Sequence, residues 1–166
     1  MRLLVGLSVP DAGSINWVKS VGGMPTNKSA DVVYIGHSNS LKEGLTVTES
    51  LQFLGQLHGR DCSNQRLMAA LERLGIKHRR SAMVRTLSQG QRRRVALARL
   101  ALETEPTLWV LDEPFDALDA VGTGEVNKLI TEHTERGGSI FLTSHIPLSL
   151  DPSLVTTLDL GGDRVE

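Results

Sequence analysis

The chain has 166 residues, a length typical of one domain and sufficient to bury a sizeable core. Its 18 basic and 19 acidic residues give a formal net charge of −1, which provides no general attraction for nucleic acid or anionic lipid. The single cysteine, Cys62, excludes an intramolecular disulfide and a cysteine-based zinc site. No apolar run approaches the roughly 20 residues that cross a bilayer, so we expect membrane contact only through a partner.

The N-terminal segment carries Leu3, Leu4 and Leu7 at helical spacing. Its apolar stretch is too short and broken for a secretory signal, so we expect the tail of a helix whose beginning lies upstream of Met1. Pro10 to Gly13 predicts a turn, and a short strand is expected over Ser14 to Val18 before an exposed loop.

Val32 to Gly36 is short, apolar and partly β-branched, which predicts a buried strand. A helix is expected to follow, capped by Thr46 or Thr48, with Glu49 in its first turn and its end at Gly59. A second helix is expected over Asn64 to Leu74. The two helices form a compact insert in the chain.

A third helix is expected to follow Leu87 and to run to about Glu103. Its pattern is aliphatic on one side and basic on the other. The basic side is formed by Arg92, Arg93, Arg94 and Arg99.

Three further apolar runs, Leu108 to Leu111, Ile140 to Leu142 and Leu154 to Leu160, alternate with a helical stretch over Ala120 to Glu135. Strands that alternate with helices favour an α/β fold, with a parallel or mixed sheet covered on both faces. There are no internal repeats.

Two carboxylates, Asp112 and Glu113, follow the apolar strand that begins at Leu108. Open α/β sheets bind ligands at the carboxyl ends of their strands, and such a pair suits phosphate chemistry. Asp112 would hold Mg²⁺ directly or through water, and Glu113 would orient and deprotonate an attacking water. Taken alone, the same residues are also typical of a strand running into an exposed acidic turn.

The segment Leu87-Ser88-Gln89-Gly90-Gln91 stands immediately before the arginine-rich helix. Ser88 can cap this helix, Gly90 lets a phosphate approach the backbone, and the unpaired amides with the helix dipole attract an anion. The simpler interpretation is a helix cap with no ligand.

His145 follows Thr143 and Ser144 at the end of the apolar run from Ile140. This position places an imidazole at the same sheet edge as Glu113, where it can donate a hydrogen bond to a γ-phosphate oxygen. A lone loop histidine is also common as a structural or surface residue.

In this order, the segments resemble the nucleotide-binding domains of the ABC transporter family. Residues 87–91 resemble the family's signature motif, 108–114 its Walker B strand, 115–119 its D-loop and 143–145 its switch histidine. The resemblance implies a P-loop NTPase-like ABC ATPase fold with a small helical subdomain. Residues 1–44 would be a remnant of the ATPase core with the Q-loop, 45–86 the helical subdomain and 87–166 the remaining core.

The resemblance also implies ATP and Mg²⁺ as cofactors and a second ATPase subunit, joined head to tail in a dimer. Asp112, Glu113 and His145 would act on the ATP of their own subunit, with Asp112 holding Mg²⁺ through water. Asp119 would cross the dimer interface. The residues that would contact the ATP of the opposite subunit are Ser88, Gln89, Gly90 and Gln91.

Finer features, such as GLSVPDAG, GQRRRVALARL and Ser144 to Leu148, resemble the ATPases of cytochrome c maturation haem exporters. This resemblance implies integral membrane transporter subunits as partners, haem export as the pathway and a cytoplasmic place on the inner face of the cell membrane. No nucleic-acid partner is expected.

Two features depart from the family pattern. The 166 residues contain no G-x-x-x-x-G-K-[ST] phosphate loop, so we expect the loop and the first strands to be missing and the chain alone to hydrolyse ATP negligibly. Ser38 stands where the Q-loop has a glutamine that senses Mg²⁺, and its hydroxyl is shorter. The alternatives are a soluble ABC ATPase and a non-enzymatic remnant that donates only its signature.

Overall fold

A computed structural model describes residues 1–15, 32–148 and 152–158. In these ranges three parallel strands form one sheet, in the order β1 (Val32–Ile35), β2 (Leu108–Asp112) and β3 (Ser139–Thr143). The register pairs Ile35 with Leu111 and Asp112 with Thr143, so the strands end at a common edge. The three strands confirm the expected runs that begin at Val32, Leu108 and Ile140.

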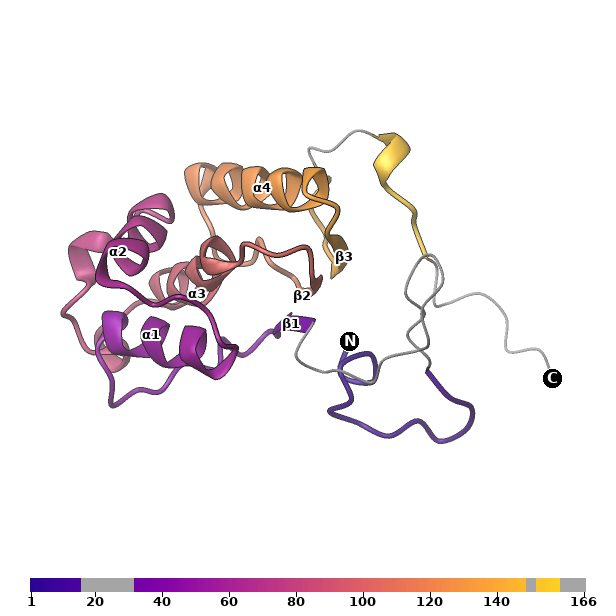
Figure 1. Cartoon of the computed structure of the whole chain (residues 1–166), viewed down its shortest axis with the longest axis horizontal. Coiled ribbons are helices and arrows are strands. Elements are labelled where there is room, and N and C mark those ends of the chain that lie inside the picture. Colours follow the sequence, from indigo (N-terminus) through magenta and orange to yellow (C-terminus); the bar gives the residue numbers. More distant parts are fainter. Residues whose placement is uncertain (16–31, 149–151, 159–166) are drawn as a thin grey trace.

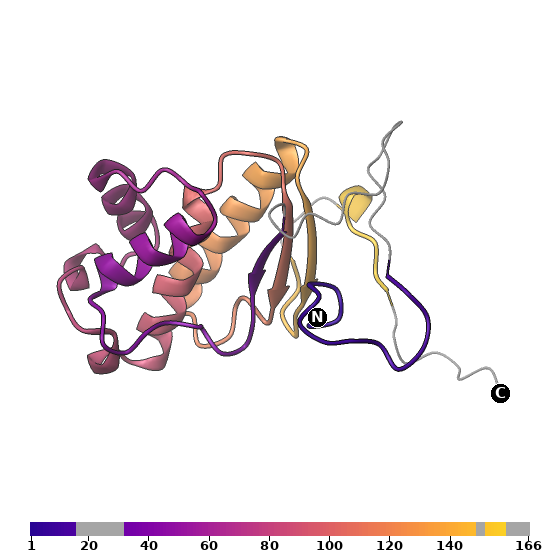
Figure 2. The ribbon, with the colours of Figure 1, turned by 60° about the horizontal axis from the view of Figure 1, so that its bottom comes forward.

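The helices of the described ranges lie together on one side of this sheet, as Figures 1 and 2 show. The side chains of Val33, Ile35, Trp109 and Leu111 are buried against them in one hydrophobic core. The N-terminal segment and the turn over Pro152–Leu154 lie on the other side (Figure 2). The expectation was a sheet covered on both faces; in the part of the chain that the structure describes, the α-helices cover only one of them.

Helices α1 (Val47–Leu57) and α2 (Asn64–Arg73) form the insert between β1 and the later core, as expected. Thr46 begins α1 with a capping box, because its hydroxyl accepts from the Glu49 amide and the Glu49 carboxylate accepts from the Thr46 amide. Gly59, with a φ of 67°, follows α1 in the left-handed conformation that glycine adopts without strain. Two short 3₁₀ turns, Lys77–Arg79 and Val84–Thr86, lead on towards the next helix.

Helix α3 (Gln89–Ala98) continues into a 3₁₀ turn over Arg99–Leu102, close to the expected end at Glu103. The expectation of a basic face on this helix is wrong at two positions, where the arginine is buried. Arg93 is 3% exposed and Arg99 is 8% exposed, because both guanidinium groups find backbone carbonyl acceptors inside the fold. Helix α4 (Ala120–Glu135) confirms the last helical stretch.

Both ends of the chain differ from expectation. The leucines near the N-terminus lie in hydrogen-bonded turns rather than in a helix, since so short a segment gives little return on helix nucleation. Gly13, with a φ of 82°, lies in the expected turn, but Ser14 and Ile15 are not in a strand, and 16–18 lie outside the described residues. Residues 155–158 also form no strand, and the two remaining residues of that apolar run are outside the described part.

No helix in the described ranges is both long enough and apolar enough to cross a membrane.

Candidate functional site

The residues singled out at the carboxyl ends of β2 and β3 lie close together in the structure. Asp112 is the last residue of β2 and pairs in register with Thr143, the last residue of β3. Glu113 and His145 follow these strands and approach each other from the two chain segments. The expectation that His145 and Glu113 share one sheet edge is therefore confirmed.

A hydroxyl that sequence reasoning did not single out joins the Asp112 carboxylate to the backbone of Glu113. Thr143 Oγ1 donates to Asp112 Oδ1 at 2.9 Å and accepts from the Glu113 backbone N–H at 3.1 Å. Glu113 has a φ of 47°, a left-handed conformation that costs a non-glycine residue about 1–2 kcal/mol. The Thr143 hydrogen bond helps to offset that cost and fixes the peptide from which the Glu113 side chain projects.

The Glu113 carboxylate faces the histidine loop. Its Oε2 accepts the backbone N–H of His145 at 3.3 Å, and its Oε1 lies 3.4 Å from His145 Nε2. The Glu113 side chain is 28% exposed, whereas the imidazole of His145 is 94% exposed. A carboxylate held at its backbone and partly open to solvent can orient a water molecule and take its proton.

Arg93 reaches the same edge from α3. Its Nη2 donates to the backbone oxygens of Asp112 at 2.7 Å and Glu113 at 2.6 Å. Its Nη1 donates to the Gly36 backbone oxygen at 2.9 Å and to Asn39 Oδ1 at 3.1 Å. Burial lowers the pKa of the Arg93 guanidinium from its ordinary value, while the carboxylates of Asp116, Asp112 and Glu113 oppose that shift.

The signature segment forms the N-terminus of α3. Ser88 accepts the Gln91 amide at 3.3 Å and its own amide donates to Gln91 Oε1 at 3.1 Å, which makes the expected helix cap a full capping box. Ser88 and Gln89 are exposed. The end of the helix is therefore accessible to a ligand or to another subunit.

Gly90 has a structural role within its own chain. A Cβ atom built at this position would lie 2.6 Å from the backbone oxygen of Ala117. The close approach requires glycine independently of any phosphate contact. It also joins the signature to the loop 115–119, a contact that the sequence alone does not reveal.

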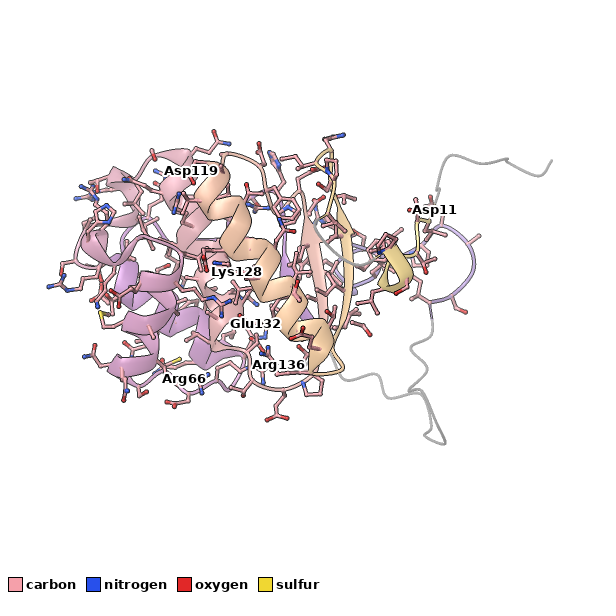
Figure 3. All side chains as sticks on the ribbon, turned by 90° about the horizontal axis from the view of Figure 1, so that it is seen from above. Asp11, Arg66, Asp119, Lys128, Glu132 and Arg136 are labelled. Carbon is pink, nitrogen blue, oxygen red and sulfur yellow. The ribbon has the colours of Figure 1, made fainter. Side chains whose placement is uncertain are left out.

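Asp119 caps α4 and sits at the N-terminal end of that helix, where Figure 3 labels it. Its Oδ1 accepts the Gly122 amide at 2.8 Å and lies 2.6 Å from Arg94 Nη2. Arg94 Nη1 donates in turn to the Leu74 backbone oxygen at 2.7 Å. The Gly122 hydrogen bond, helped by Arg94, lowers the pKa of the Asp119 carboxyl.

Ser38 lies in the loop after β1, beside a pocket of about 480 Å³ between this loop and the start of α3. The lining includes Ser38 and Gln89, so the structure brings the loop and the signature together. The other lining residues are His37, Asn39, Ser40, Leu41, Val84, Leu87 and Arg92.

Within the described ranges, no group of three or more histidine, cysteine, aspartate or glutamate residues is placed to hold a metal ion. The hard oxygens available at the sheet edge are those of Asp112, Glu113 and the Thr143 hydroxyl. Such a set fits Mg²⁺ carried by a phosphate ligand, because Mg²⁺ keeps several waters and takes few protein oxygens.

A parallel sheet with an aspartate-glutamate pair at its carboxyl edge, a histidine just after the next strand and a capped signature helix defines an ABC-type ATPase domain. Residues 1–116 match the family described as ABC transporter, and the chain belongs to that family. The family and the fold expected from the sequence are confirmed.

One curated relative is the cytochrome c biogenesis ATP-binding export protein CcmA of Dechloromonas aromatica (strain RCB). It is 41% identical over 162 residues, which cover 97% of this chain and 79% of the relative. The same-named protein of Escherichia coli (strain K12) is 40% identical over 169 residues, covering 99% and 77%. The expected resemblance to cytochrome c maturation ATPases is thereby confirmed.

A solved ATP-binding subunit of an ABC transporter has a similar structure, with a TM-score of 0.72 and 26% identity; the match covers 87% of this chain and 61% of that one. This chain therefore spans less than two thirds of the solved subunit.

Proposed function

We propose that this chain is the ATP-binding and ATP-hydrolysing subunit of an ABC exporter that serves cytochrome c biogenesis, with haem export as the pathway. The observation that carries the proposal is the arrangement of Asp112, Glu113 and His145 around Thr143 at one sheet edge. The two CcmA relatives, aligned over nearly the whole chain, support the pathway.

At this edge Asp112 would hold Mg²⁺ through water. Mg²⁺ supplies charge stabilisation at the phosphates when it is bound. Glu113 orients the attacking water and takes its proton. His145, largely exposed and beside Glu113, donates a hydrogen bond to the γ-phosphate.

The signature acts on the ATP of a second ATPase subunit. Ser88 and Gln89 are exposed at the capped end of α3, and Gly90 and Gln91 complete that end. Backbone amides and the helix dipole there favour an anionic group. A solved dimeric bacterial ABC transporter cassette, MJ0796, supports the pairing, with a TM-score of 0.58 and 25% identity over 71% of this chain and 54% of that one.

The Asp119 carboxylate lies at the edge of the same surface. In this structure it caps α4 and pairs with Arg94. In the dimer it links the two ATP sites across the interface, and its exposure leaves it accessible for that contact.

Integral membrane subunits are the other partners, and they hold the chain on the cytoplasmic face of the cell membrane. The pocket beside Ser38 supports this part, since it lies between the loop after β1 and the signature helix. A membrane subunit seated there would touch both segments. Ser38 replaces the longer amide side chain of the family pattern, so the contact to Mg²⁺ at this position is weaker than is usual in the family.

The experiment is co-expression with the integral membrane subunits of a cytochrome c biogenesis exporter, followed by purification in detergent and measurement of Mg²⁺-dependent ATP hydrolysis. We expect the chain to co-purify and Glu113→Gln to lower turnover by about a hundredfold or more without loss of assembly. Glu125→Gln is the matched control, since Glu125 lies in α4 and pairs with Lys128 at 2.6 Å. Turnover that survives in Glu113→Gln, or failure to co-purify with any membrane subunit, would contradict the proposal.

A further inference from the structure

Arg93 is buried where three parts of the molecule meet. Its side chain leaves α3, and the residue is 3% exposed. One guanidinium nitrogen binds the loop after β1, through Gly36 and Asn39, and the other binds the two peptides at the end of β2. The helix that carries the signature is thus tied to the catalytic edge by a single side chain.

The location is costly for a charged group. A buried guanidinium must recover its lost hydration through hydrogen bonds, and here it does so with neutral oxygens rather than with a carboxylate. Arg93 Nε remains buried without a partner in the described structure. The other N–H groups of Arg93 keep their acceptors only while the loop after β1 and the end of β2 hold their present positions. Displacement of either segment therefore leaves a buried N–H group of Arg93 without a partner.

One of the bonds acts on the strained residue of the site. Arg93 Nη2 lies 2.6 Å from the backbone oxygen of Glu113, whose φ is 47°. Thr143 holds the amide side of the same residue at 3.1 Å. The two contacts fix both peptide groups of Glu113, and this orientation decides where its carboxylate points.

We propose that Arg93 is a positioning residue that sets the orientation of Glu113 and couples it to the loop Gly36–Asn39. Displacement of this loop by a membrane partner moves the guanidinium and thereby the catalytic peptide. The role deepens the proposed ATPase function and rests on it. Arg93 itself touches no reacting atom in this account.

An arginine outside this site supplies a matched control. Arg66, in α2, donates through its Nη2 to the Leu102 backbone oxygen at 3.2 Å. Arg66→Gln thus removes a guanidinium that bonds to a backbone carbonyl, as Arg93 does, without touching the loop after β1 or the end of β2.

Hydrogen exchange of backbone amides in the complex with the membrane subunits tests the coupling without any need for turnover. In Arg93→Gln we expect the amides of both 36–40 and 113–117 to exchange about tenfold faster, because these two segments open locally more often. The amides of α1 and α2 should exchange at an unchanged rate. Arg66→Gln should leave both segments unchanged. Faster exchange in only one segment, or a uniform rise through the whole chain, would overturn the proposal.

Arg93→Lys is the second variant. Its compact ammonium carries the charge but does not reproduce the planar fork, so it is expected to restore protection in one segment and not in both. Full protection of both segments by lysine would contradict the coupling role.

ATP hydrolysis by the same complex separates this inference from the proposed function. We expect Arg93→Gln to lower kcat about tenfold and to leave KM for ATP within about twofold, since positioning acts on the reaction and not on nucleotide binding. A tenfold loss in kcat/KM that comes entirely from a higher KM, with kcat unchanged, would overturn the positioning role. If the unaltered complex shows no hydrolysis, the proposed function fails, and the exchange result still decides whether Arg93 couples the two segments.

Discussion

At the scale of single residues, the Thr143 hydroxyl links the carboxyl ends of β2 and β3. This hydroxyl donates to the Asp112 carboxylate and accepts from the Glu113 amide, so its donor and its acceptor capacity are both used. The residue was visible in the sequence beside His145, but its role was not. It depends on a register between residues 31 positions apart in the chain, which no local pattern encodes.

Thr143→Val keeps the shape of the side chain and removes both hydrogen bonds. We expect the free energy of unfolding to fall by about 1–3 kcal/mol, because the Glu113 amide loses its partner. We also expect kcat in the assembled complex to fall about tenfold, because the Glu113 peptide is freed. Urea unfolding and steady-state hydrolysis check the two effects. Thr143→Ser keeps the hydroxyl and should behave nearly as the unaltered chain does; equal losses in both variants would contradict the account.

Gly90 gives a second prediction at this scale. Gly90→Ala places a methyl group against the Ala117 backbone oxygen, which cannot move as a flexible side chain does. We expect a loss of about 1–3 kcal/mol in stability, measured by denaturant unfolding. Gly124→Ala is the control, since nothing lies within 4 Å of its Cβ position inside α4. That variant should gain up to about 1 kcal/mol from helix propensity, and a similar loss in both variants would contradict the steric reason.

At the scale of elements, local chemistry predicted the helices well. The capping boxes at Thr46 and Ser88 are formed by residues three positions apart, so the sequence contains all of their partners. The burial of Arg93 and Arg99 was missed because their acceptors are backbone oxygens from distant segments. The strand expected near the C-terminus also failed in its described part, since an apolar run predicts a strand only where a neighbouring strand pairs with it.

The packing of α4 on the sheet depends on a neutral histidine. His133 is fully buried and stacks on Trp109 with ring centroids 3.8 Å apart, and its Nε2 lies 2.8 Å from the Thr107 backbone oxygen. Burial lowers the pKa of His133, and the Thr107 hydrogen bond opposes that shift in part. A charged imidazole is thus disfavoured in the folded chain.

The pH dependence of stability follows from this shift. The unfolded chain takes up the proton first, near the ordinary histidine pKa of about 6.5, so the contribution of His133 is complete above that pH and is lost as the pH falls towards the lower folded pKa. The pKa of His58, lowered by burial and by Arg99, adds in the same direction. We expect unfolding free energy to decrease between about pH 6.5 and 5. Urea unfolding over this range checks it, and His133→Gln should reduce the slope; a stability that rises on acidification would contradict the assignment.

At the scale of the whole molecule, the residues proposed to act on ATP fall into two groups in different places. In the proposed function, Asp112, Glu113 and His145 would act on nucleotide held by their own subunit, whereas Ser88 at the capped end of α3 would serve the opposite one. The described fold brings the first three residues together at one sheet edge and leaves Ser88 exposed on a separate surface.

We predict that this chain works as one subunit of an ABC ATPase dimer. A mixed complex of this chain with a catalytically intact ATPase subunit of the same family and the membrane subunits tests it directly. The hydrolysis measured is that of the site to which this chain donates its signature. We expect Ser88→Arg to lower that hydrolysis about a hundredfold, because a bulky cation blocks the end of α3. Ser63→Arg, at the start of α2, is the control and should have no effect. Hydrolysis unchanged by Ser88→Arg in a complex that still assembles would contradict the claim.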